Sequence, residues 1–223
     1  MFICQNPKIS PKNFSFIVAP NHDNYFGSNV INSVGAIHNF KIGKGTKTKH
    51  KKEGDYLVSC IIGGENNHYV FSNNEIEKLC SKIIQLKKQN SNLQFLVITS
   101  RRTGDEIKKM IKLKLNSIAQ LWLGEGENPY EYAIYNSKFF IITSDSTSMI
   151  SEASISGKPI YIYQLPFKRK SIRFERFHDE FKRLSITRDL KEVNVLKEWT
   201  YNKINESERI AGIIKERIIE GIQ

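Results

Sequence analysis

The chain has 223 residues, of which 39% are hydrophobic, and this is enough for one complete apolar core. No apolar run approaches the roughly 18 residues that cross a bilayer, no signal peptide is evident, and the three cysteines lack zinc or disulfide spacing, so we expect a cytoplasmic protein. The formal net charge is +11, but lysine, asparagine and isoleucine are abundant throughout, so charge alone does not indicate a nucleic-acid partner.

Two strand-like runs open the chain, at Phe2–Gln5 and Phe14–Ala19, and they are too few for a domain. The polar segment PNHDNYFGSN and a lysine-rich stretch follow, and together they are typical of a connector. The lysine-rich stretch has no interleaved aromatic residues for base stacking, so a solvated loop is favoured over a nucleic-acid site. Its cationic residues are Lys41, Lys44, Lys47, Lys49, His50, Lys51 and Lys52.

From Tyr56 onward, short apolar runs alternate with segments of helical periodicity. This alternation predicts an α/β fold with a Rossmann-like parallel sheet and right-handed crossovers. The predicted strands are Tyr56–Ile62, Leu93–Thr99, Ile118–Leu123, Phe139–Thr143 and Ile160–Tyr163, and the predicted helices are Glu75–Lys88, Glu106–Leu115, Pro129–Tyr135, Thr147–Ser156, Glu175–Arg183 and Glu206–Glu220.

Polar and cationic side chains follow several of the predicted strands. In an open α/β sheet, ligands lie outside the carboxyl ends of the strands, where the amides of a helix N-terminus favour anions. The candidate binding residues are Gly63, Gly64, Ser100, Arg101, Arg102, Asn128, Tyr130, Ser144, Asp145, Ser146 and Ser148. Each has a structural alternative, because a glycine pair can form a plain turn, surface arginines are usually solvated, and short polar residues cap helices.

A His-Asp pair, His22 and Asp23, lies in the connector, where a cleft between two units would be. A histidine beside a carboxylate can act as a general base, although an exposed loop histidine is commoner. The sequence leaves both alternatives open.

Taken in order, the segments GGE, TSRRT, NPY, TSDSTSMISEA and GKP, with PNHD upstream and YNKINESERIA near the end, resemble the mitochondrial fission ELM-type family of bacteria and plants. The C-terminal half of that family resembles GT-B glycosyltransferases. The resemblance implies that Glu152 holds the ribose hydroxyls, the turn Ser144–Ser148 faces the diphosphate or sugar, and Arg101 neutralises the pyrophosphate. It implies metal-independent glycosyl transfer from a nucleoside diphosphate sugar, with no cofactor; no DXD metal motif is present.

The same resemblance implies a domain organisation. Residues 1–35 would be a remnant of an N-terminal Rossmann-like domain, residues 36–200 the nucleotide-sugar-binding domain of GT-B type, and residues 201–223 a crossing helix. Such a truncated or split copy would be a poor catalyst alone, even if it binds the donor nucleotide. It would leave Ile210, Ile214 and Ile218 exposed and prone to self-association.

A glycosyltransferase has two alternatives. The first is a non-catalytic adaptor, peripheral to an anionic membrane, which the lysine-rich stretch would contact. The second, an epimerase with bound NAD, is disfavoured because no GxGxxG follows the first strand of the alternating region. The nucleotide base, the sugar and the acceptor are not specified by the sequence.

Overall fold

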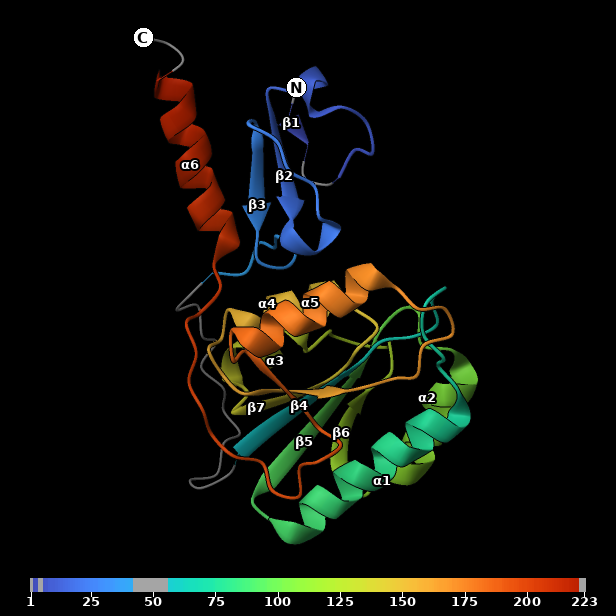
Figure 1. The fold of residues 1–223 in the computed structure, drawn as a ribbon. Helices are drawn as coiled ribbons and strands as arrows, with labels where there is room; N and C mark the ends of the chain where they lie inside the picture. Colours follow the sequence, from blue (N-terminus) through green and yellow to red (C-terminus); the bar gives the residue numbers. More distant parts are fainter. Residues whose placement is uncertain (1, 4–5, 42–55, 221–223) are drawn as a thin grey trace.

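The computed structural model describes residues 2–3, 6–41 and 56–220, so the lysine-rich stretch beyond Lys41 lies outside the described residues. The chain forms a six-stranded sheet covered by helices and a separate three-stranded sheet beside the last helix (Figure 1). The α/β class and the Rossmann-like parallel sheet are therefore confirmed.

The six-stranded sheet has the order β6-β5-β4-β7-β8-β9, and every neighbouring pair is parallel. Strand order reverses between β4 and β7, and such a switch point opens a crevice at the carboxyl ends of the two strands. The strands are β4 (Tyr56–Ile62), β5 (Leu93–Thr99), β6 (Ala119–Trp122), β7 (Phe139–Thr143), β8 (Ile160–Tyr163) and β9 (Thr187–Asp189).

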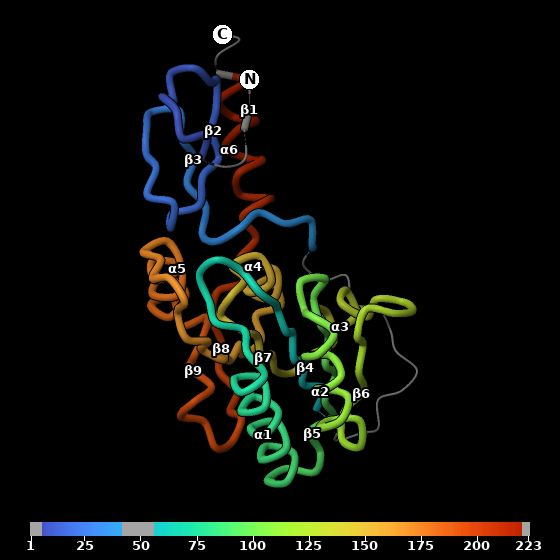
Figure 2. The backbone as a smooth tube through the Cα atoms, turned by 90° about the vertical axis from the view of Figure 1, so that its right-hand side faces the viewer, coloured from blue at the N-terminus to red at the C-terminus, as the bar shows by residue number. Residues whose placement is uncertain are grey.

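Helices cover both faces of this sheet (Figure 2). Along β4, Cys60 and Ile62 pack against α1 and α2, while Ile61 packs on the opposite face with residues of α3, α4 and α5. Two apolar faces explain why the strands form nearly continuous hydrophobic runs in the sequence. The helices are α1 (Asn73–Gln89), α2 (Asp105–Leu115), α3 (Tyr130–Asn136), α4 (Thr147–Ser154) and α5 (Ile172–Arg183).

The small sheet is parallel, with the order β1-β2-β3. Its strands are connected by segments that contain short 3-10 helices, η1 and η2, where a parallel sheet usually has α-helices. Its strand β3 was not predicted, because VINS is short and lies between turn-forming residues. The elements are β1 (Phe2–Ile3), η1 (Pro11–Asn13), β2 (Phe16–Pro20), η2 (Asn21–Asp23) and β3 (Val30–Ser33).

The last helix, α6 (Glu206–Glu220), packs on one face of the small sheet. Ile210 is only 3% exposed because it contacts Val18 and Ile31, and Ile214 is partly buried beside it. The prediction that Ile210 and Ile214 are exposed is therefore wrong, since strands of the small sheet supply their cover. Ile218, at 42% exposure, is exposed as predicted.

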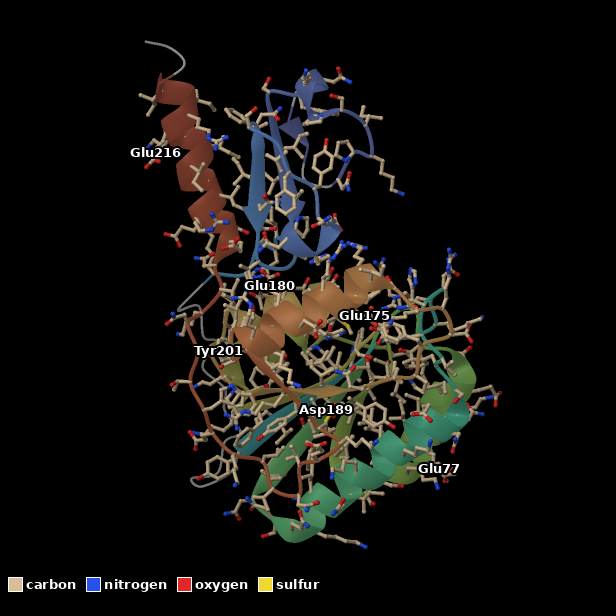
Figure 3. All side chains as sticks on the ribbon, in the orientation of Figure 1. Glu77, Glu175, Glu180, Asp189, Tyr201 and Glu216 are labelled. Atoms are coloured by element: carbon tan, nitrogen blue, oxygen red, sulfur yellow. The ribbon has the colours of Figure 1, made fainter. Side chains whose placement is uncertain are left out.

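The two units meet where η2 lies against α5. The side-chain amide of Asn21 donates to the Glu180 carboxylate at 2.5 Å, and Arg173 at the start of α5 forms an ion pair with Asp23. Figure 3 shows Glu180 on the part of α5 that lies below the small sheet. Helix α5 thus separates the carboxyl edge of the large sheet from the small sheet.

Candidate functional site

Three loops are joined by hydrogen bonds at the carboxyl ends of β4, β5 and β7. The Gly63 amide donates to Thr143 Oγ1 at 2.8 Å, and the Gly64 amide donates to Asp145 Oδ2 at 3.1 Å. The Thr103 hydroxyl donates to the Gly63 carbonyl. The polar residues predicted at this edge therefore lie together, as parallel topology requires.

The glycine pair is explained by packing. A Cβ atom on Gly63 would lie 2.0 Å from Asp145 Oδ2, and one on Gly64 would lie 2.1 Å from the Arg102 carbonyl oxygen. Neither glycine has a positive φ angle. The space expected for a ligand is thus filled by Asp145 and by the backbone of Arg102.

Asp145 and Arg102 form an ion pair, with Nη2 and Oδ2 2.9 Å apart. The Asp145 side chain is fully buried, whereas that of Arg102 is 41% exposed and also donates to the Gly64 carbonyl at 2.8 Å. Ser100 Oγ accepts from the Arg102 amide at 3.1 Å, so it shapes the same turn. Arg101 is exposed and forms no ion pair with another described residue, which leaves it available for an anion.

The serines of the turn after β7 have different environments. Ser144 is buried, and its carbonyl lies 3.0 Å from Nε2 of His178, a residue the sequence did not indicate. Ser146 is the N-cap of α4 and accepts from the Met149 amide at 3.5 Å. Ser148 is exposed in the first turn of α4. Ser148 and the free amides of this turn are thus the groups that remain open to a ligand.

Glu152 lies on α4 beside α3 and accepts a hydrogen bond from the Tyr130 hydroxyl. Burial raises the pKa of Glu152, and the bond from Tyr130 opposes this shift. Burial, together with the nearby Glu152 charge, raises the pKa of Tyr130. The half-buried Glu152 carboxylate is thus already bound to one hydroxyl, and Tyr130, which supplies that hydroxyl, lines a cavity.

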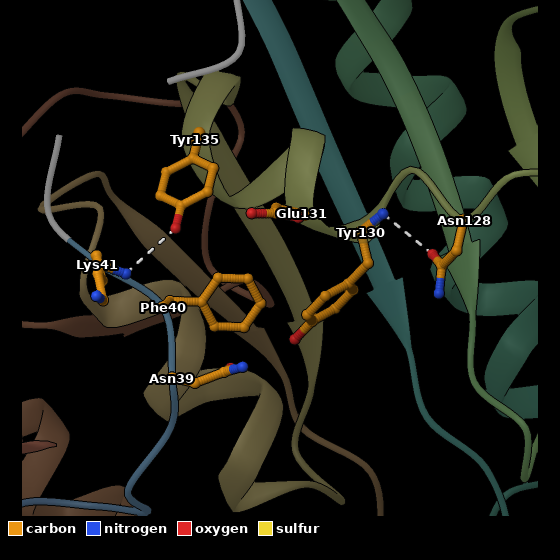
Figure 4. Close-up of a pocket in the computed structure, with 7 residues that line it drawn as sticks. All are labelled: Asn39, Phe40, Lys41, Asn128, Tyr130, Glu131 and Tyr135. Atoms are coloured by element: carbon orange, nitrogen blue, oxygen red, sulfur yellow. Dashed lines mark hydrogen bonds between the residues drawn. The ribbon is translucent and has the colours of Figure 1, made fainter. Parts of the chain in front are cut away.

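This cavity, of about 420 Å³, lies between the connector and α3. The Phe40 ring lies 6.0 Å from the Tyr130 ring and 6.1 Å from the Tyr135 ring, centroid to centroid (Figure 4). Asn128 Oδ1 accepts from the Tyr130 amide at 3.0 Å, which fixes the start of α3. The lining residues are Asn39, Phe40, Lys41, Asn128, Tyr130, Glu131 and Tyr135.

His22 and Asp23 lie in the contact between the two units. His22 is 1% exposed, with its ring edge-on to Phe177 at 5.3 Å and Nε2 3.4 Å from Arg173 Nη2. Burial, and secondarily the Arg173 charge, lower the pKa of His22 to about 4. The imidazole is therefore neutral near pH 7, and Asp23 is held by Arg173.

Most of the predicted site residues thus form three groups: the loop network with Asp145, the Tyr130–Glu152 pair with the cavity that Tyr130 lines, and the His22 contact. Arg101 and Ser148 belong to none of these groups and are exposed. Among the residues described, no cluster of three His, Cys, Asp or Glu side chains could hold a metal ion. No described helix is long and apolar enough to cross a membrane.

The fold and the site define a doubly wound α/β protein with its polar residues gathered at the switch point. The chain belongs to the mitochondrial fission ELM1 family, whose model matches residues 1–218. It is 33% identical over 172 residues to the uncharacterized protein RP120 of Rickettsia prowazekii, which covers 75% of this chain and 48% of that protein. It is 20% identical over 246 residues to mitochondrial fission protein ELM1 of Arabidopsis thaliana, covering 96% of this chain and 57% of that protein.

The chain therefore spans about half the length of these relatives. Among solved structures, S. aureus MnaA with UDP superposes with a TM-score of 0.52 at 12% identity, covering 92% of this chain and 61% of that one. At this identity the similarity concerns the fold alone. The predicted family and the GT-B-type, Rossmann-like fold are confirmed.

Proposed function

We propose that the chain binds the nucleoside diphosphate part of a nucleotide sugar at the carboxyl edge of the large sheet. The observation that carries this proposal is the half-buried Glu152 carboxylate, which is bound, among described residues, by the hydroxyl of Tyr130, a residue that lines an aromatic cavity. A ribose hydroxyl can replace the Tyr130 hydroxyl as a donor to this carboxylate.

The remaining parts of the ligand have matching groups nearby. The Phe40 and Tyr135 rings offer flat apolar surfaces for a base. The diphosphate would lie at the first turn of α4, where free amides and Ser148 favour negative charge, and the exposed Arg101 in the loop after β5 would supply a counter-charge. The likeness to the S. aureus protein crystallised with UDP supports UDP as the first ligand to test.

The proposed reaction is glycosyl transfer without a metal, in which Arg101 and the α4 amides stabilise charge on the departing diphosphate. His22 or Asp23 would serve as the base. Because His22 is buried and Asp23 is paired with Arg173, either group would act only after α5 and η2 separate.

A catalytically silent binding protein is the second candidate. This candidate is favoured by the contacts of the two predicted base residues: His22 packs on Phe177, and Asp23 is paired with Arg173. An enzyme would release UDP from a UDP-sugar in the presence of an acceptor, whereas the silent protein would bind UDP and release none.

The test of nucleotide binding is titration calorimetry with UDP. Glu152→Gln is expected to weaken binding by about 1.5–3 kcal/mol, the value of a hydrogen bond to a charged group. Glu131→Gln is the matched control, because Glu131 is an exposed carboxylate of α3 that lines the cavity next to Tyr130. Equal losses in both variants, or no binding of any common nucleotide by the unmodified chain, would contradict the proposal.

A further inference from the structure

The connection between β8 and α5 and the first turns of α5 form a strongly basic segment of the described chain. Between Phe167 and Arg176 there are five cationic side chains and one carboxylate. Lys170 pairs with Glu175 at 3.2 Å, and Arg173 pairs with Asp23. The other three cations are exposed and form no ion pair with described residues: Lys168, Arg169 and Arg176.

Two apolar side chains are exposed within this basic segment. Phe167 is 39% exposed and stacks one face of its ring on Tyr69, with centroids 4.7 Å apart. Ile172 is 62% exposed at the first position of α5. The segment therefore presents apolar and cationic groups on the same stretch of surface.

Backbone hydrogen bonds fix the shape of the segment. The Lys168 and Arg169 amides both donate to the His68 carbonyl, at 2.8 and 3.1 Å, and the Val70 amide donates to the Pro166 carbonyl at 2.8 Å. Figure 1 shows the resulting loop at the N-terminal end of α5, beside the turn that follows β4. Because its backbone is already ordered, binding here would lose little conformational entropy.

We propose that this segment docks the protein on a bilayer that contains anionic phospholipids. Lipid phosphates attract Lys168, Arg169 and Arg176, and the interface between headgroups and acyl chains accepts Phe167 and Ile172. A soluble polyanion would satisfy the cations but would give the two apolar side chains no apolar phase. The segment shares no residue with the Glu152 cavity, so this inference does not depend on nucleotide binding.

The experiment is sedimentation of the full chain with vesicles, without nucleotide. The chain is expected to bind vesicles of mixed phosphatidylcholine and phosphatidylglycerol, and to bind vesicles of phosphatidylcholine alone more weakly. The bound fraction on the mixed vesicles is expected to fall as the salt concentration is raised. Replacement of Lys168, Arg169 and Arg176 by Gln is expected to weaken binding by at least about tenfold. The matched control replaces Lys108, Lys109 and Lys112 of α2 by Gln, which removes the same charge elsewhere and should have little effect.

Ile172→Ser tests the apolar part, because this side chain is 62% exposed. It is expected to weaken vesicle binding severalfold with unchanged far-ultraviolet circular dichroism. Equal losses in the α2 control would indicate unspecific attraction by net charge and overturn the proposal. If the Gln variant of Lys168, Arg169 and Arg176 weakens vesicle binding but Ile172→Ser does not, the segment binds a soluble polyanion instead, and the proposal is wrong. If vesicle binding falls only in a Gln variant of Lys47, Lys49, Lys51 and Lys52, the membrane contact lies in that stretch, and the proposal is also wrong.

Discussion

At the scale of single residues, burial determines which candidate groups can take part in chemistry. Asp145 and His22 have the residue types of a ligand contact and a general base, yet both side chains are enclosed by protein. Glu152 and Arg101 remain accessible to different degrees, since Glu152 is half-buried and Arg101 is exposed. Accessibility therefore favours Glu152 and Arg101 as the residues to test first.

The buried His22 is expected to make stability depend on pH. Its folded-state pKa of about 4 lies below the unfolded value of 6.5, so the unfolded chain takes up the proton first as pH falls. The contribution of neutral His22 to the free energy of unfolding is fully present above pH 6.5 and is lost as the pH falls toward 4. It is on the order of 3 kcal/mol in all.

Urea denaturation at several pH values checks this expectation. His22→Gln should lose less stability than the unmodified chain between pH 6.5 and 4. Burial also lowers the pKa of His38 and His178, so part of the dependence should remain in the variant. Identical pH profiles for both proteins would show that His22 is not protected from protonation.

At the scale of elements, helix α6 belongs with the small sheet although it comes last in the chain. Glu206 in its first turn accepts from the Val34 amide at 2.9 Å, and Arg209 donates to the Asn32 carbonyl at 2.6 Å. These bonds orient the helix so that Ile210 faces the sheet. The same orientation leaves Ile218 in solvent.

Truncation of these two isoleucines should therefore have unequal effects. Ile210→Ala is expected to cost about 2–5 kcal/mol, the usual range for a buried isoleucine. Ile218→Ala, its control on the same helix, should stay within about 0.5 kcal/mol. Thermal and urea denaturation measure both, and similar losses would mean that α6 does not pack as described.

At the scale of the whole molecule, the two units differ greatly in the size of their cores. The large sheet has extensive apolar clusters on both faces, whereas the small sheet relies on a few residues around Ile17 and on Val18, Ile31 and Ile210. A smaller core gives less resistance to local opening.

Hydrogen exchange should reveal this difference. Amides of β2 and β3 are expected to exchange well before those of β4, β5 and β7, because the small sheet can open without the large one. Peptide-resolved mass spectrometry measures the rates. A single common rate for both sheets would instead indicate that the η2 and α5 contacts make the chain one cooperative unit.

Much of this architecture could be predicted because β-branched runs mark buried parallel strands. The bounds of β4, β5, β7 and β8 agree with the predicted strands, whereas β3 and β9 are too short and polar to be recognised. The edge of the site followed from parallel topology. The presence of Phe40, Tyr135 and His178 near the predicted site residues could not be predicted in this way, because tertiary packing brings these residues together from distant segments.

The pairing of α6 with β2 and β3 also sets an order of events during translation. The small sheet leaves the ribosome before the large sheet, but the helix that buries Val18 and Ile31 is made only after the large sheet is complete. At typical elongation rates this interval is roughly 10–40 s. For that time the face of β2 and β3 that α6 covers in the folded chain lacks this helix, so a chaperone has time to bind there.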